Sequence, residues 1–221
     1  MEVNQVTKFL ENIYDTAIDG VVGLTGADEL ARSYLLQHGD AEIAIKMLVR
    51  WQVGQSAALG FCTNIGGLLT LPIAIPLDIG GTAVLQLRMI AAIAQLRGYK
   101  IRSHQVRTFA IMCLIGNAAV EVLKKFGITV GTKMAAQGVG RISGQTLLRI
   151  NQAVGFRLVT KAGVTGATNL LKWVPLVGGM VGGTIDGMTT YAAAEAAMKV
   201  FPSMALDLGI KALVIEGKPI S

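Results

Sequence analysis

Hydrophobic residues recur at three- and four-residue steps at the start of the chain. Val6, Leu10, Ile13 and Ala17 lie at such steps, and Glu11 and Asp15 fall between them. This period places apolar side chains on one side of a helix and charged side chains on the other. The pattern therefore predicts an amphipathic helix that opens the chain.

Two further helices are predicted from residues that favour helix ends. Thr25, with Asp28 three residues later, resembles a capping box that starts a short helix, and Gly39 is expected to end this helix. Asp40 is expected to cap a helix that runs through Trp51.

A long apolar stretch lies between Ala57 and Leu77, with no charged residue inside it. Its length meets the criterion for a membrane-spanning helix. Pro72 and Pro76 fall within the stretch, however, and proline interrupts a helix. We therefore expect a helical hairpin, whose second helix ends at Gly98. Hydropathy leaves open whether this hairpin enters a bilayer or lies inside the globule.

The second half of the chain predicts three more helices. Ser103 caps a helix whose apolar run reaches Val120 and which ends at Gly127. A helix over about residues 142–161 follows, and the last helix begins at Pro175. Together the patterns predict an all-α fold, a multi-helix bundle with hydrophobic helical hairpins that glycine and proline interrupt.

The last predicted helix carries glycines at four-residue spacing. This spacing leaves a bare groove along one side of a helix, where a second helix can approach closely. The second helix belongs either to the same chain or to another membrane-associated chain. The helix-packing candidates are Gly178, Gly179, Gly182, Gly183 and Gly187.

Composition makes the chain unusually apolar. Hydrophobic residues make up 52% and charged residues 15%, whereas soluble domains average about 25% charged residues. Cys62 and Cys113 have no spacing typical of a disulfide framework or zinc site, so we expect buried free thiols. The first twenty residues lack the apolar core of a signal peptide, which predicts a cytoplasmic location.

Charge divides the chain into two parts. Residues 1–45 hold eight acidic and two basic residues and form a predicted segment of acidic amphipathic helices. Residues 46–221 carry a net charge of +12 and form the main helical domain, continuous with the first part in one globule. Bases are concentrated between Arg97 and Lys172, where they would attract anionic lipid head groups, nucleic acid or the chain's own acidic N-terminus. No nucleic-acid-binding motif accompanies them, so nucleic acid is not the expected partner.

Asp78 and Asp186 are isolated carboxylates in apolar surroundings. A buried charge needs a partner, because an unpaired one costs several kcal/mol. Asp78 follows a proline at a helix start, where the macrodipole favours a negative charge. For Asp186 we expect an ion pair with Arg149, Arg157 or Lys161; a proton or ion relay is the functional alternative.

No group of residues predicts catalysis. His38 and His104 have no cysteine or carboxylate at a metal-ligand step, and no nucleophile, zinc-hydrolase or nucleotide-binding motif occurs. We therefore expect no enzyme activity, no cofactor and no metal site.

Several sequence blocks stand out along the chain: Leu71-Pro-Ile-Ala-Ile-Pro76, Gln86 to Ala94, Gln105-Val-Arg107, Cys113 to Asn117, Ile150 to Arg157, and Val174-Pro-Leu-Val-Gly-Gly179. In this order they resemble the EcsC family over about residues 46–201. This resemblance implies an all-helical protein of the bacterial cytoplasm, linked to a membrane and to an ABC-type exporter, with no established reaction. The polar members of the matching blocks are candidate ligand-binding or polar core residues: Arg88, Asn117, Asn151, Arg157 and Lys161.

Two functions remain open from the sequence. The first is a non-enzymatic helical protein that binds anionic lipid or a membrane transporter, either peripherally or with its hairpins inserted in the inner membrane. The second is a soluble helical carrier that encloses a lipid or another apolar ligand. The sequence does not predict an oligomeric state.

Overall fold

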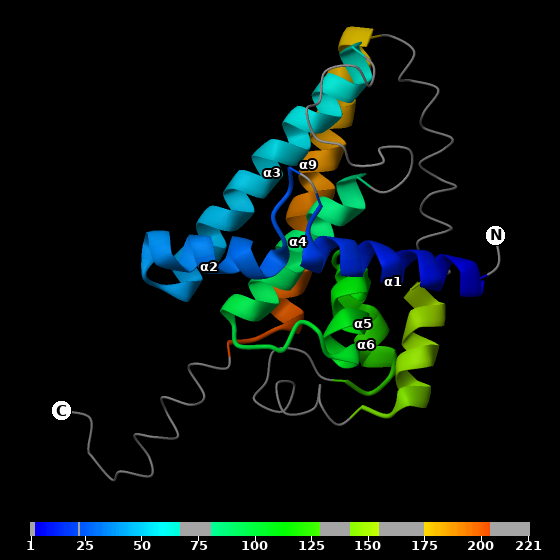
Figure 1. Cartoon of the computed structure of the whole chain (residues 1–221). Helices are drawn as coiled ribbons and strands as arrows, with labels where there is room; N and C mark the ends of the chain where they lie inside the picture. Colours follow the sequence, from blue (N-terminus) through cyan, green and yellow to red (C-terminus); the bar gives the residue numbers. More distant parts are fainter. Residues whose placement is uncertain (1–2, 22, 67–80, 129–141, 155–174, 204–221) are drawn as a thin grey trace.

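A computed structural model describes residues 3–21, 23–66, 81–128, 142–154 and 175–203 (Figure 1). These residues confirm the all-α fold, since they contain helices and a single isolated β-bridge but no strand. Residues 144–154 are also helical. The labelled helices are α1 (Val3–Asp19), α2 (Ala27–His38), α3 (Ala41–Gly66), α4 (Gly81–Leu96), α5 (His104–Cys113), α6 (Ala118–Lys125) and α9 (Pro175–Val200).

Two long helices, α3 and α9, pack against each other along their length and run in opposite directions (Figure 1). Helix α4 contacts both of them and also packs against α1 and α2. In Figure 1, helix α1 crosses the pair of long helices. The upper half of this pair lies above α1, and α5 and α6 lie below α1. The bundle is therefore built around α4, whose residues 84–94 are all buried.

The buried side chains form one hydrophobic cluster that includes residues from both parts of the chain. Leu10 and Ile13 of α1 and Leu30 of α2 belong to the same cluster as Ile90 and Phe201. The acidic N-terminal helices thus pack into the core of the main domain. The predicted boundary after residue 45 falls inside α3.

Most helix ends carry the residues from which they were predicted. Gly39 has a φ of 70° and closes α2, and the Asp40 carboxylate accepts a hydrogen bond from the Ile43 amide at 2.9 Å. Ser103 caps α5 by accepting from the Val106 amide. These positions follow from local chemistry, because a side-chain oxygen or a left-handed glycine completes the unpaired groups of a helix end.

The capping box at Thr25 was wrong. Helix α2 begins after Gly26, which makes no side-chain cap. The Thr25 hydroxyl instead accepts a hydrogen bond from Arg88 of α4 at 2.8 Å. The capping box predicted that the Thr25 oxygen would accept from the start of α2. Its hydrogen-bond donor is instead Arg88, which is distant in sequence.

The single helix predicted from Ser103 to beyond Val120 was also wrong, because the structure divides it into α5 and α6. Gly116 in the intervening turn has a φ of 62°, and a Cβ atom there would lie 3.2 Å from the Cβ of Ala192. Gly116 therefore approaches α9 closely and turns the chain between α5 and α6, although the apolar pattern of the sequence continues there.

The structure describes only the two helical arms of the predicted hairpin. Helix α3 runs continuously to Gly66, so it joins the helix predicted through Trp51 to the first arm. The second arm is α4, followed by Gly98 with a φ of 89°. The turn with its two prolines lies outside the described residues, as does the end of the helix predicted over 142–161.

Candidate functional site

Arg97 joins three helices at one end of the bundle. Its guanidinium donates to both carboxylate oxygens of Glu42, at 3.0 and 2.8 Å. The remaining Nη1 donates to the backbone oxygens of Met198 at 2.6 Å and Phe201 at 2.8 Å. Because a bidentate arginine also satisfies carbonyls that the end of α9 leaves unpaired, this side chain fixes α3, α4 and α9 together.

Helix α1 supplies acidic partners for two further arginines. Arg102 donates to Asp19 at 2.8 Å, and Arg107 pairs with Asp15 and lies over the ring of Tyr14, 5.7 Å from its centroid. Of the three partners considered for the basic segment, the chain's own acidic N-terminal part therefore engages these arginines. We call the following set the paired region: Asp15, Asp19, Glu42, Arg97, Arg102 and Arg107.

Buried ionisable groups near the paired region remain in their neutral forms. Tyr14 donates its hydroxyl to the Ile101 backbone oxygen at 2.8 Å, and Tyr99 donates to Pro202 at 3.0 Å. Burial raises the pKa of Tyr14 and raises the pKa of Tyr99 to about 12. Burial likewise raises the pKa of the free Cys113 thiol, which keeps it in the unreactive protonated form.

Of the two charged candidate residues that the structure describes, Arg88 and Asp186, Arg88 is the more deeply buried. Its side chain is 7% exposed, its Nη2 donates to Thr25, and its Nε has no partner among the residues described. Burial lowers its pKa, and the nearby Tyr34 and Glu29 act in the opposite direction. In the described ranges no carboxylate lies within ion-pair distance of it, so a neutral hydroxyl is its main partner.

Asn117 and Asn151 do not join Arg88 in one site. Asn117 is exposed at the start of α6 and accepts a hydrogen bond from Lys199 at 3.4 Å. Asn151 is buried in the helical residues 144–154, and its Oδ1 has no partner in the part of the chain that the structure describes. The three residues thus occupy separate elements with separate surroundings.

Asp186 lies half-buried within α9, where its backbone oxygen accepts from the Thr189 hydroxyl at 3.1 Å. Asp78, Arg157 and Lys161 lie outside the described residues. The expected ion pair of Asp186 therefore stays a prediction.

Gly187 lies against α3. A Cβ atom at this position would lie 3.3 Å from the Cβ of Ala57 and 3.8 Å from the Val53 backbone oxygen. The neighbouring helix at Gly187 thus belongs to the same chain. Gly183 is buried in α9. Gly178, Gly179 and Gly182 are also part of α9, and the structure describes their helical backbone but not what packs against them.

Several buried polar side chains on α3 and α4 were not predicted from the sequence. Gln52 and Ser56 of α3 are buried, and their side-chain polar atoms have no partner within the described ranges. Gln86 of α4 donates to Thr190 at 3.0 Å and Thr189 at 3.4 Å. The four-residue step between Gln52 and Ser56, which places both on the same side of α3, was the available signal for their shared burial.

Large apolar side chains stand exposed along α3 and α9. Trp51 is 60% exposed, Met188 68% and Tyr191 51%, although such residues usually contribute to a core. A groove of about 420 Å³ lies between the two helices. It is lined by Ile43, Lys46, Met47, Val49, Arg50, Tyr191 and Met198.

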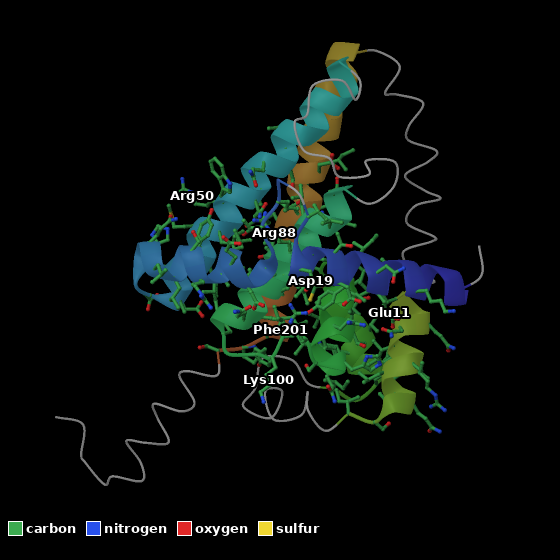
Figure 2. All side chains as sticks on the ribbon, viewed as in Figure 1. Glu11, Asp19, Arg50, Arg88, Lys100 and Phe201 are labelled. Atoms are coloured by element: carbon green, nitrogen blue, oxygen red, sulfur yellow. The ribbon has the colours of Figure 1, made fainter. Side chains whose placement is uncertain are left out.

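We define the α3–α9 face as this groove together with Trp51 and Met188. Trp51 follows Met47 by four residues on α3, and Met188 precedes Tyr191 by three residues on α9, so each adjoins a residue that lines the groove. Figure 2 shows Arg50 toward the periphery of the molecule and Arg88 toward its centre. The face therefore combines aromatic, methionine and basic side chains at the surface, an arrangement that the sequence analysis did not predict.

The described helices include none with both the length and the hydropathy needed to cross a bilayer. Their histidine, cysteine and carboxylate side chains form no group of three that could hold a metal ion.

The fold and the face define an all-α bundle with an amphipathic surface groove. Comparison with known proteins finds no matching family model, no matching curated protein and no matching solved structure. The resemblance to the EcsC family therefore stays a prediction from the sequence.

Proposed function

We propose that this chain is a non-enzymatic protein that binds the surface of a membrane through its α3–α9 face. The observation that carries the proposal is the exposure of Trp51, Met188 and Tyr191 beside Lys46 and Arg50. Tryptophan and tyrosine have an apolar ring and a polar group, which suits the boundary between head groups and acyl chains.

Rough energies support binding that is peripheral and reversible. Complete burial of a large apolar side chain contributes about 1.5–3 kcal/mol. Since a third to a half of each of these residues is already covered, each would add roughly 1–2 kcal/mol on entering the interface. Each base near an anionic surface adds about 1 kcal/mol more. These contributions together favour association without a membrane-spanning helix.

The shape of the groove favours surface binding over an enclosed carrier site. Ile43 and Tyr191, which line it, are each about half exposed, so a ligand there would remain in contact with its surroundings. A ligand carrier instead buries most of its ligand's surface. A membrane protein, such as an ABC-type exporter, is the alternative partner for the same face, and protein-free vesicles distinguish it from lipid.

Flotation of the full chain with vesicles tests the proposal. The vesicles contain phosphatidylcholine and phosphatidylglycerol, and the wild type is expected to float with them. The triple variant Trp51→Ser, Met188→Ser and Tyr191→Ser is expected to remain in the dense fraction. Leu148→Ser removes an equally exposed apolar side chain from another helix and should float like the wild type.

Circular dichroism and urea unfolding should show both variants folded, because exposed substitutions affect stability little. A wild type that stays in the dense fraction would contradict the proposal. So would a triple variant that floats as well as the wild type.

A further inference from the structure

We infer that the groove of the α3–α9 face binds an anionic phospholipid, with the head-group phosphate held by Lys46 and Arg50 and part of an acyl chain in the groove. This inference rests on the proposed function and adds to it the class of lipid and the residues that select it.

The two bases are placed to act on one anionic group. Lys46 and Arg50 are four residues apart on α3, so they project from the same side of the helix, and both line the same groove. Both side chains are exposed. Arginine and lysine are the side chains that proteins use most to bind phosphate, the first as a planar fork and the second as a compact charge.

Among the described residues, neither base has an acidic partner. No carboxylate lines the groove, and in the part of the chain with described side chains neither Lys46 nor Arg50 forms an ion pair. Glu195 on the neighbouring helix lies instead 3.9 Å from Lys199. Like charges one turn apart destabilise a helix. A bound phosphate would relieve this repulsion, which gives the site its preference for an anion.

The rest of the groove suits hydrocarbon. Ile43 and Met47 form one wall and Tyr191 and Met198 the other. Methionine is unbranched and polarisable, so it adapts to an irregular apolar ligand. The volume of about 420 Å³ falls at the small end of the range for ligand sites. The groove therefore accommodates a segment of one acyl chain beside the head group.

A second copy of this chain fits the groove less well than a lipid does. A symmetric dimer brings the same patch of both copies together. Lys46 and Arg50 would then add their charge to that of the same residues in the partner copy. Since the groove contains no acid to offset that charge, electrostatic complementarity favours an anionic lipid over self-association.

A vesicle titration of the full chain tests the inference. Binding is measured to phosphatidylcholine vesicles and to vesicles of equal parts phosphatidylcholine and phosphatidylglycerol. The double variant Lys46→Gln and Arg50→Gln is expected to lose on the order of tenfold or more in affinity for the anionic vesicles. The control variant Lys124→Gln and Lys125→Gln removes the same charge from the exposed end of α6 and should lose less than threefold.

The outcomes separate the inference from the proposed function. Equal wild-type affinity for both kinds of vesicle overturns the inference and leaves membrane binding in place. A double variant that loses no more affinity than the control also overturns it. Absence of binding to either vesicle overturns both. A dimer in light scattering that Tyr191→Ser dissociates would assign the face to a second copy and overturn the inference.

Discussion

The paired region and the α3–α9 face contain the same kinds of basic side chain in opposite circumstances. In the paired region, Arg97, Arg102 and Arg107 each meet a carboxylate from the acidic first part of the chain. On the α3–α9 face, Lys46 and Arg50 lie beside exposed apolar side chains and line a groove without an acid. The position of basic side chains that have no carboxylate partner among the described residues, rather than the number of basic residues, thus indicates where an anionic ligand would bind.

The proposed anion contact differs from the one expected from the sequence. The sequence analysis placed it in the segment from Arg97 to Lys172, where bases are most numerous. The first arginines of that segment hold the fold together through α1 and α3. The bases on which the proposal rests, Lys46 and Arg50, precede the segment.

Of the substitutions considered, removal of Arg97 from the paired region should lower stability most. Arg97→Met leaves the Glu42 carboxylate and the backbone oxygens of Met198 and Phe201 without their donor. Arg97 is buried and serves a half-exposed carboxylate and two backbone oxygens, so its loss should lower the free energy of unfolding by about 3 kcal/mol. Urea unfolding measures this change. A midpoint equal to that of the wild type would contradict the role of Arg97 in joining three helices.

The contact that supports the α3–α9 face can be tested at two glycines. Gly187→Leu should lower the free energy of unfolding by about 2 kcal/mol, because a side chain there meets Ala57. Gly54→Ala is the control, since a Cβ atom at this exposed position of α3 has no neighbour within 4 Å. It should stabilise the protein by about 1 kcal/mol. The same sign for both substitutions would contradict the close packing at Gly187.

Alkaline pH should weaken the core next to the paired region. The pKa of Tyr99 is raised in the folded state to about 12 from an ordinary value of 10.0. Its contribution to stability is therefore complete below pH 10 and is lost as the pH rises toward 12. In urea unfolding over this range, Tyr99→Phe should show a smaller loss than the wild type. Parallel curves for the two proteins would contradict this account.

The smallest effect is expected from the exposed ion pair of the paired region. Arg102→Gln removes the bond to Asp19, in which both side chains are exposed. Solvent screens such pairs, so the urea midpoint should not change measurably. A shift as large as that of Arg97→Met would show that burial does not decide the strength of these pairs.

Local chemistry made most of the fold predictable. Asp40, Ser103 and Gly39 mark helix ends because their side chain or backbone conformation completes the helix itself. The errors at Thr25 and Gly116 arise from contacts with α4 and α9, far away in sequence. The periodicity of hydrophobic residues gives no information about such contacts.

The candidate site was less predictable than the fold. Ile43, Met47 and Trp51 indicated a helix by their four-residue spacing, but the same spacing fits a buried or an exposed side. Helices α2, α4 and α9 cover other parts of α3 and leave these three side chains exposed. Which side of an apolar helix stays uncovered depends on its neighbours.

The fluorescence of Trp51 on vesicles tests the central claim most directly. The chain has two tryptophans, so Trp173→Phe leaves Trp51 as the only one. On vesicles that contain phosphatidylglycerol, its emission should shift to shorter wavelength, and brominated acyl chains should quench it. Emission that neither shifts nor responds to brominated lipid, while the protein floats with the vesicles, would contradict binding through the α3–α9 face.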